Sequence, residues 1–265
     1  MKDISPFSEM TQLAVEAVFE AGAILRGGFG TKYTKSLKPG VQNYVTEFDH
    51  ASELCIISKI KKKYPTHAFL AEESGASANF GAEILWIIDP LDGTTNFAHN
   101  IPLFCISVAA LGPDGLECGV IYQPMTEELY IAEKGKGAYL NNVKVHVSLS
   151  GRFAGGVGAT GFPRNIHENP LNCVNHFMNV LNQGTIIRNL GSSALNMAYV
   201  SSGCFDAYWA VSLHPWDIAA GVLLIQEAGG KVTTYGGESY HVLSGSPIVA
   251  TNQLVHLEVL SYLYP

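Results

Sequence analysis

The chain has 265 residues, 47% of them hydrophobic and 15% charged, and a formal net charge of −7 at pH 7. This composition is that of a globular protein rather than a disordered or fibrous one, and the length suffices for one large domain or two packed halves. The negative balance disfavours nucleic acid as a partner, because Lys and Arg must neutralise its phosphates. The charge is uneven, since residues 1–150 carry 12 basic and 17 acidic side chains and residues 151–265 only 4 and 6.

Neither a membrane segment nor a disulfide framework is predicted. No apolar run reaches the roughly 18–20 residues that a spanning helix needs, and the first residues lack the apolar core of a secretory signal. We therefore expect a soluble, cytoplasmic protein without a membrane partner. The five cysteines are odd in number and scattered, with no Cys-x-x-Cys pair. They are expected to be small buried side chains in a reducing compartment.

The first half of the chain predicts two helices and then a series of short strands. Apolar spacing predicts a helix over 8–27. A second helix is expected to begin at Thr46, a good N-cap, with Asp49 in the position of a capping-box acid, and to end before Pro65. Asn141-Asn142 predicts a hairpin turn. The predicted strands lie at 68–71, 84–88, 105–111, 119–122, 129–132 and 138–140.

Around residues 148–156 the pattern changes to alternating strands and helices. Strands are predicted at 157–160, 185–188, 206–211 and 230–234, and helices at 171–182, 193–201 and 216–227. The sequence thus predicts an α+β half over 1–150 and an α/β half over 151–265, which share one interface. We expect an antiparallel sheet in the first half and a mixed sheet in the second.

The most informative segment is Trp86–Asn96, where an apolar strand is expected to end at Asp89 before the chain turns. Asp92 follows three residues later, and the Leu91 carbonyl lies between the two acids. These three oxygen donors can converge on one point, and hard cations such as Mg²⁺ prefer oxygen ligands. The alternative is a simple turn in which the aspartates act as caps.

Next to these acids, Gly93, Thr94 and Thr95 bring a small residue, two hydroxyls and their amides to a predicted helix start. Such a helix start favours a phosphate oxygen. The pattern is therefore typical of a site for a phosphorylated ligand.

Further acids lie at Glu72, directly after a predicted strand, at Asp217, in the first turn of a predicted helix, and at Asp49. Each has an ordinary alternative, because adjacent acids in a loop are commonly solvated and Asp in a first turn is helix-start chemistry. Asp217 nevertheless lies in the charge-poor half, beside Trp216, so it is either a cap or a ligand.

Together, these segments resemble the inositol monophosphatase family, within the lithium-sensitive, metal-dependent phosphatase superfamily. Asp89–Asn96 is similar to the first motif of that family, Trp216–Gly221 to the second, and Val45–Asp49 to a segment that supplies another acid. The resemblance covers nearly the whole chain. It implies a layered α-β-α-β-α sugar-phosphatase fold and a homodimer, and three further segments carry it: Gly135–Tyr139, Gly191–Ala194 and Glu227–Gly230.

The resemblance also implies two Mg²⁺ ions and a third, weaker one. Glu72, Asp89 and the Leu91 carbonyl would bind the first ion. Asp89, Asp92 and Asp217 would bind the second. Asp49 and Glu72 would reach the third through waters.

The implied reaction is hydrolysis of inositol monophosphate, or of a related small polyol or sugar phosphate, by a metal-activated water. Thr94, with Asp49 or Glu72, would orient the water. Gly93, Thr94 and Thr95 would hold the phosphate. The organic part of the substrate would contact Gly191, Ser192 and Ser193, and Arg164 or Arg188 could add a charge, or else form ordinary ion pairs.

Two positions depart from the family pattern. Inositol-hydrolysing members have an acid seven residues before the second-motif aspartate, where this chain has Ala210, which puts inositol preference in doubt. Asn43 stands where the family often has Asp, and we expect only an indirect effect. The alternative function is that of a binding or regulatory protein in transcription antitermination or RNA metabolism, with a transcription factor as its partner.

Overall fold

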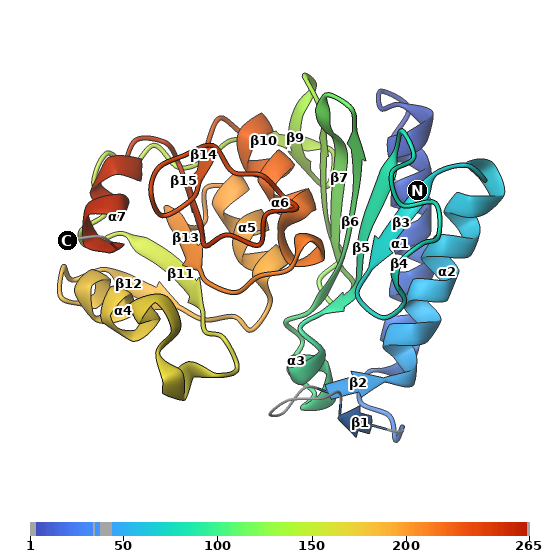
Figure 1. The fold of residues 1–265 in the computed structure, drawn as a ribbon, viewed down its shortest axis with the longest axis horizontal. Helices are drawn as coiled ribbons and strands as arrows, with labels where there is room; N and C mark the ends of the chain where they lie inside the picture. Colours follow the sequence, from blue (N-terminus) through green and yellow to red (C-terminus); the bar gives the residue numbers. More distant parts are fainter. Residues whose placement is uncertain (1–3, 34, 38–43, 264–265) are drawn as a thin grey trace.

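The computed structural model describes residues 4–33, 35–37 and 44–263, so Asn43 lies outside the described residues. Its elements stack in five layers (Figure 1). Helices α1 (Glu9–Gly28) and α2 (Glu47–Lys63) cover an eight-stranded sheet. Helices α5 (Ser193–Ser201) and α6 (Pro215–Glu227) lie between that sheet and a five-stranded one. The outermost layer contains α4 (Cys173–Leu181) and α7 (His256–Leu263), and the predicted α-β-α-β-α arrangement is confirmed.

Local sequence explains where the two N-terminal helices begin. Ser8 caps α1 by accepting a hydrogen bond from the Thr11 amide. Thr46 and Asp49 form the predicted capping box of α2. The helices are joined by ion pairs from Lys59 to Glu16 and Glu20, at 3.1 and 2.7 Å. Both predicted helices are therefore confirmed to within one or two residues.

The large sheet has the strand order β10-β9-β8-β7-β6-β5-β3-β4. It is antiparallel, as predicted, except that β3 and β5 run parallel. Asn141 and Asn142 have φ of 50° and 70°, which confirms the predicted hairpin turn. The strands are β3 (Ala68–Ala71), β4 (Gly75–Ala76), β5 (Leu85–Asp92), β6 (Cys105–Gly112), β7 (Gly115–Gln123), β8 (Glu128–Glu133), β9 (Gly137–Leu140) and β10 (Val143–Val145).

The smaller sheet has the order β12-β11-β13-β15-β14 and is mixed, as predicted. Its strands are β11 (Val157–Gly161), β12 (Ile186–Arg188), β13 (Ala207–Ala210), β14 (Lys231–Thr233) and β15 (Ile248–Thr251). Strand β15 and helix α7 were not predicted. Nor were the paired strands β1 (Lys35–Leu37) and β2 (Tyr44–Thr46), or the short 3₁₀ turns at Ile166–Glu168 and Pro170–Asn172.

The expectation that the strand ends at Asp89 is wrong, because β5 continues through Pro90 to Asp92. Proline is tolerated there because β3, the neighbour on one side, already ends opposite Ile88. On the other side the register with β6 shifts between Asp89 and Asp92, which is a β-bulge.

The central helices pack tightly on the large sheet. A Cβ added to Gly119 of β7 would lie 2.9 Å from the Ala220 carbonyl of α6, so only glycine permits this approach. One hydrophobic core cluster contains residues from both the sheet and the helix, including Ile121 of β7 and Leu224 of α6. The division of the chain near residue 150 stays a prediction. Over the described ranges, no helix combines the length and apolar character needed to cross a membrane.

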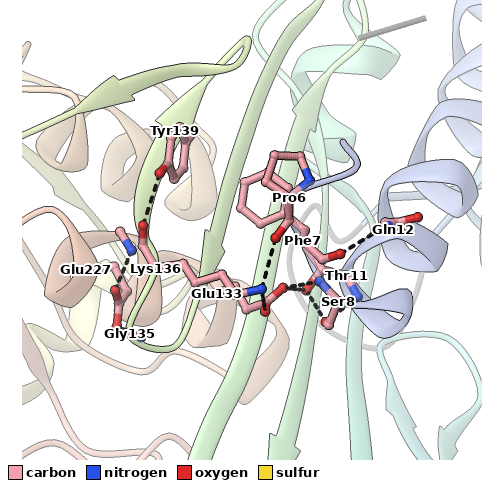
Figure 2. A network of polar contacts seen from close by, with 11 residues as sticks. Pro6, Phe7, Ser8, Thr11, Gln12, Glu133, Gly135, Lys136, Tyr139 and Glu227 are labelled. Carbon is pink, nitrogen blue, oxygen red and sulfur yellow. Dashed lines mark hydrogen bonds and ion pairs between the residues drawn. The ribbon is translucent and has the colours of Figure 1, made fainter. Parts of the chain in front are cut away.

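A turn between β8 and β9 connects the outer and the central helix layers (Figure 2). At its start, Glu133 accepts hydrogen bonds from the Ser8 amide (2.8 Å) and the Thr11 hydroxyl (2.6 Å) of α1. At its end, Glu227 of α6 accepts from the amides of Gly135 and Gly137, at 2.8 and 2.7 Å. The same turn thus holds helices that lie on opposite faces of the sheet.

Candidate metal and phosphate site

The bulge in β5 brings Asp89 and Asp92 to one side of the sheet. Side chains three residues apart on a regular strand point to opposite faces. Here Asp89 pairs with Ser107 and Asp92 with Cys105, so β5 has one residue more than β6 over this stretch. The extra residue reverses the alternation, and both carboxylates can face the same cavity.

Glu72 reaches this point because β3 and β5 are parallel and end together. Ala71 pairs with Ile88, and the Glu72 amide donates to the Ile88 carbonyl at 3.2 Å. Glu72 therefore follows β3 at the level where Asp89 follows Ile88 in β5. The glutamate that looks like a loop residue in the sequence is placed beside the first aspartate.

Asp217 and Asp49 arrive from helix starts, and each acts as a cap while lying near the other acids. Asp217 accepts from the His214 amide at 2.7 Å. Asp49 accepts from the amide and the hydroxyl of Thr46, at 2.8 and 2.6 Å. Its other oxygen accepts from the Thr94 hydroxyl at 3.0 Å. Asp217 and Asp49 can therefore cap their helices and also belong to the acidic cluster.

The acids destabilise one another's ionised forms. Desolvation by burial, followed by repulsion from neighbouring acids, raises the pKa of Asp89 and of Asp217 well above the ordinary value. Burial also raises the pKa of Asp92 to about 6, although hydrogen bonds from Ser192 and Ala194 lower it. Within the described part of the chain these three aspartates form no ion pair. A cluster of acids so poorly compensated fits a cation, which would supply the missing charge.

The acids are not, however, preassembled around one point. Among residues 4–33, 35–37 and 44–263, no group of three or more His, Cys, Asp or Glu side chains is already arranged to hold a metal ion. Asp92, for example, accepts hydrogen bonds from the Ser192 hydroxyl and the Ala194 amide, at 2.6 and 2.7 Å. The assignment of particular metal ligands stays a prediction.

A cavity of about 710 Å³ opens beside these acids, lined by residues from 72–96 and from 161–217. Glu72, Asp92 and Asp217 lie at its acidic end. Its wall also contains most of the residues that the sequence analysis assigned to substrate, together with Arg164: Thr95, Gly191, Ser192 and Ser193. A second cavity, of about 810 Å³ between α4 and the loop after β14, contains none of the predicted site residues.

Gly93 and Thr94 lie beside the acids at the start of α3 (Thr94–Ala98). Gly93 has φ +97°, and an added Cβ would lie 2.9 Å from the Leu103 carbonyl, so no other residue fits without strain. The Thr94 hydroxyl lies 3.0 Å from the Leu91 carbonyl as well as from Asp49. The Leu91 carbonyl therefore points to the same region as the acids.

Ser192 differs from Gly191 and Ser193 because its side chain is buried and forms hydrogen bonds within the protein. Its hydroxyl donates to Asp92 and accepts from the Leu195 amide at 3.2 Å, which makes Ser192 the N-cap of α5. Asp92 of the first half thereby holds the start of a helix of the second half. Ser192 as a substrate contact stays a prediction, and its position as a link to Asp92 was not foreseen.

Asn96 was also missed as an individual residue, although it lies in the first motif. Its amide donates to the Leu103 carbonyl (2.6 Å) and the Leu190 carbonyl (2.7 Å), and so connects the two halves. A Cβ on Gly191 would lie 2.8 Å from that amide. The only signal in the sequence was the motif itself.

Ala210 is buried at the end of β13 and contributes no polar group. It lies opposite Gly161, which lines the cavity. Arg188, in the edge strand β12, is exposed and is not part of the cavity wall, unlike Arg164. Of the two arginines, the structure places only Arg164 next to the acids.

Known proteins resemble this chain over almost its full length. The Nus factor SuhB of Pseudomonas aeruginosa is 38% identical over 261 residues, which cover 97% of this chain and 96% of that protein. The inositol-1-monophosphatase of Mesorhizobium japonicum is 38% identical over 255 residues, covering 96% and 95%. The crystal structure of the extragenic suppressor protein suhB from Bartonella henselae superposes with a TM-score of 0.92 at 35% identity, covering 97% and 99%.

A model of the inositol monophosphatase family matches residues 7–263. That range contains both motif segments, all the acids of the cluster and the eight- and five-stranded sheets. The resemblance seen in the motifs is therefore confirmed over the whole fold, and the chain belongs to the inositol monophosphatase family.

Proposed function

We propose that this protein is a Mg²⁺-dependent phosphomonoesterase that hydrolyses inositol monophosphate or a related small polyol or sugar phosphate. The observation that carries the proposal is the cluster of buried, mutually repelling acids at one end of a cavity. Family membership supports the reaction class. The inositol-1-monophosphatase relative supports the substrate class, whereas Ala210 leaves inositol itself open.

Two Mg²⁺ ions, and a third that binds more weakly, fit the charge of the cluster. Glu72, Asp89 and the Leu91 carbonyl would hold one ion, and Asp89, Asp92 and Asp217 another, with Asp49 and Glu72 reaching the third through waters. Bound there, Mg²⁺ supplies an acidified water and neutralises charge on the phosphoryl group.

Thr94 and Asp49 are the residues that we assign to orienting the attacking water. The Thr94 hydroxyl donates to Asp49 or to the Leu91 carbonyl, each at 3.0 Å, so its oxygen remains able to accept a hydrogen bond from water. Asp49 is held in place by Thr46 at the start of α2. Glu72, which lines the same cavity, would accept a hydrogen bond from the other hydrogen of the water.

The phosphate would lie against Gly93, Thr94 and Thr95, where the glycine leaves room for its oxygens. The organic part of the substrate would lie along Gly191, Ser192 and Ser193, which line the same cavity. Hydrolysis would proceed by direct attack of water, without a phosphorylated enzyme.

The test is phosphate release from a panel of esters, including inositol 1-phosphate, with Mg²⁺ and with EDTA. We expect Mg²⁺-dependent turnover that Asp89→Asn lowers by about 10³-fold or more. Asp206→Asn is the matched control, since Asp206 is a buried aspartate remote from the cavity that accepts from Ser148. If folded wild-type protein releases phosphate from no ester of the panel in the presence of Mg²⁺, the proposal is refuted.

A second candidate function is binding within the transcription machinery. The observation that favours it is that the Pseudomonas relative is named a Nus factor. The partner would be a protein, because the net charge of −7 disfavours direct contact with RNA. Co-purification of tagged wild-type and Asp89→Asn protein from cells tests it. Transcription factors retained equally by both variants would support a role independent of catalysis, and their absence from both would exclude it.

We also propose a homodimer that forms through α4 and the edge strand β12. Helix α4 contains no charged residue and exposes Val174, Met178 and Leu181, and Ile186 of β12 is exposed nearby. Such an uncharged apolar surface suits a second copy of the chain. Light scattering should give the dimer mass for the wild type and the monomer mass for Met178→Glu. A cytoplasmic location and sensitivity to lithium remain proposals that follow from the family.

A further inference from the structure

The cavity of about 810 Å³ beside α4 has no part in the proposed reaction and has polar walls of its own. One wall is a single face of α4, which lies in the outermost layer (Figure 1). Successive residues of this wall are one, three or four positions apart, a spacing that brings side chains together on a helix surface: Asn172, Asn175, His176 and Asn179. The other wall is the loop between β14 and β15.

Two ring side chains of this cavity are more than nine-tenths buried. His176 is 6% exposed and Tyr235 is 7% exposed, and their rings meet edge to face with centroids 5.3 Å apart. Within the described residues, neither the His176 ring nitrogens nor the Tyr235 hydroxyl has a hydrogen-bond partner. The His176 Nδ1 is fully enclosed, whereas the His176 Nε2 and the Tyr235 hydroxyl keep accessible surface in residues that line the cavity.

These two polar atoms indicate a ligand. Polar groups on side chains so deeply buried nearly always have hydrogen-bond partners in native proteins. Since no described residue supplies one, the partner has to come from what enters the cavity. A volume of about 810 Å³ lies within the range of about 300–1,000 Å³ that is usual for small-molecule sites.

The charge of the lining disfavours an anionic ligand. Among the described residues that line the cavity there is neither lysine nor arginine, so no side chain there can neutralise a phosphate. Burial lowers the pKa of His176, so its ring is uncharged at neutral pH. The carboxylate of Glu238, which accepts from the Thr234 hydroxyl, would repel an anion.

The amides of the α4 wall favour hydroxyl groups. Asn175 uses its Oδ1 to accept from Asn169, which leaves its amide hydrogens available. Asn179 uses its amide nitrogen to donate to the Tyr262 carbonyl, which leaves its Oδ1 available as an acceptor. A wall that offers both donors and acceptors suits hydroxyls, because a hydroxyl donates and accepts through one oxygen.

We propose that this cavity binds an uncharged sugar or polyol, at a site separate from the metal and phosphate site. His176 Nε2 and the Tyr235 hydroxyl would bind its hydroxyls at the floor, and Asn175 and Asn179 would bind them from α4. The site is a binding site without chemistry. The inference does not depend on the proposed phosphatase function.

The test is saturation-transfer NMR with glucose, maltose and myo-inositol, followed by titration, in EDTA so that no Mg²⁺ holds a ligand at the acidic cluster. For the wild type we expect at least one of the three to bind with a dissociation constant of about 1 mM or lower. Glucose 6-phosphate and inositol 1-phosphate should each bind more weakly than the parent compound.

Tyr235→Phe is the decisive variant, because it removes only a hydroxyl that has no partner among the described residues. Its urea midpoint should equal that of the wild type, and it should bind the sugar about fivefold more weakly or worse. Asn175→Ala, at an exposed position of α4, should weaken binding similarly. Tyr139→Phe is the matched control: its hydroxyl donates to the Lys136 carbonyl at 3.1 Å, outside the cavity, so binding should be unchanged.

Three results would overturn the inference: no saturation transfer from folded wild-type protein to any of the three compounds, undiminished binding in both Tyr235→Phe and Asn175→Ala, or tighter binding of the phosphate esters than of their parents. Each of them leaves the phosphatase proposal intact, because that proposal is tested by phosphate release in Mg²⁺.

Discussion

Replacing Asp92 by asparagine is expected to stabilise the metal-free protein while it removes a proposed metal ligand. Burial raises the pKa of Asp92 from 3.8 to about 6. Each unit corresponds to about 1.4 kcal/mol, so ionised Asp92 costs the folded protein up to about 3 kcal/mol at pH 8. Asparagine carries no charge, and its carbonyl can still accept from Ser192 or Ala194. We expect a net gain of about 1–3 kcal/mol in the free energy of unfolding.

The sign of the pH dependence follows from the direction of the shift. Because the pKa of Asp92 is higher in the folded than in the unfolded protein, the folded state binds more protons between about pH 4 and 6. The cost is therefore full above pH 6 and disappears as the pH falls to 3.8. The advantage of Asp92→Asn should be largest at pH 8 and much smaller at pH 4.5.

The assay is urea denaturation in EDTA and in Mg²⁺ at both pH values. Asp206→Asn is the matched control, because Asp206 accepts from the Ser148 hydroxyl (2.5 Å) and the Val157 amide (2.9 Å) through different oxygens. Asparagine can replace only one of these acceptors, so this variant should lose about 1–3 kcal/mol. Two results would refute the reasoning. In one, Asp92→Asn has a lower free energy of unfolding than the wild type in EDTA at pH 8. In the other, the substitution changes the free energy of unfolding by the same amount at both pH values.

Three further predictions concern other parts of the molecule. The ring nitrogens of His256 lie 2.9 Å from the hydroxyls of Thr233 and Thr251, and burial lowers the pKa of His256 to about 4. The free energy of unfolding should therefore fall by up to about 3 kcal/mol as the pH drops from 6.5 to 4. Urea titrations of His256→Gln should show a smaller fall over the same pH range. Gly119→Val should lower the free energy of unfolding by about 1–3 kcal/mol by urea titration, since its Cβ would meet α6, and an unchanged value would contradict the packing argument. Thr94→Val should lower kcat by about 10²-fold with an unchanged circular dichroism spectrum, and near-normal turnover would remove its role in orienting water.

The elements with strong local signals could be predicted from the sequence. Strand β3 and helix α5 have the predicted bounds, and the Thr46–Asp49 capping box explains the start of α2. Strand β15 was missed because the short apolar run Ile248–Ala250 is ambiguous. Helix α7 was missed because Leu257, on an eight-residue helix, is exposed.

The acids of the site could be named but not placed. Glu72 looks like a solvated loop residue until the parallel pairing of β3 and β5 brings it beside Asp89. The bulge that aligns Asp89 with Asp92 depends on the register with β6, which no local pattern encodes.

The hydrogen bonds from the start of α5 to Asp92 have a consequence for folding. The partners of its carboxylate, Ser192 and Ala194, are 100 and 102 residues away in the chain. Closing a loop of about 100 residues costs more conformational entropy than closing a short one, and contacts of this kind slow folding. Asp92 acquires these hydrogen bonds only when the start of α5 packs beside the end of β5. A partly folded chain can therefore contain every acid of the cluster in native secondary structure and still lack a working site.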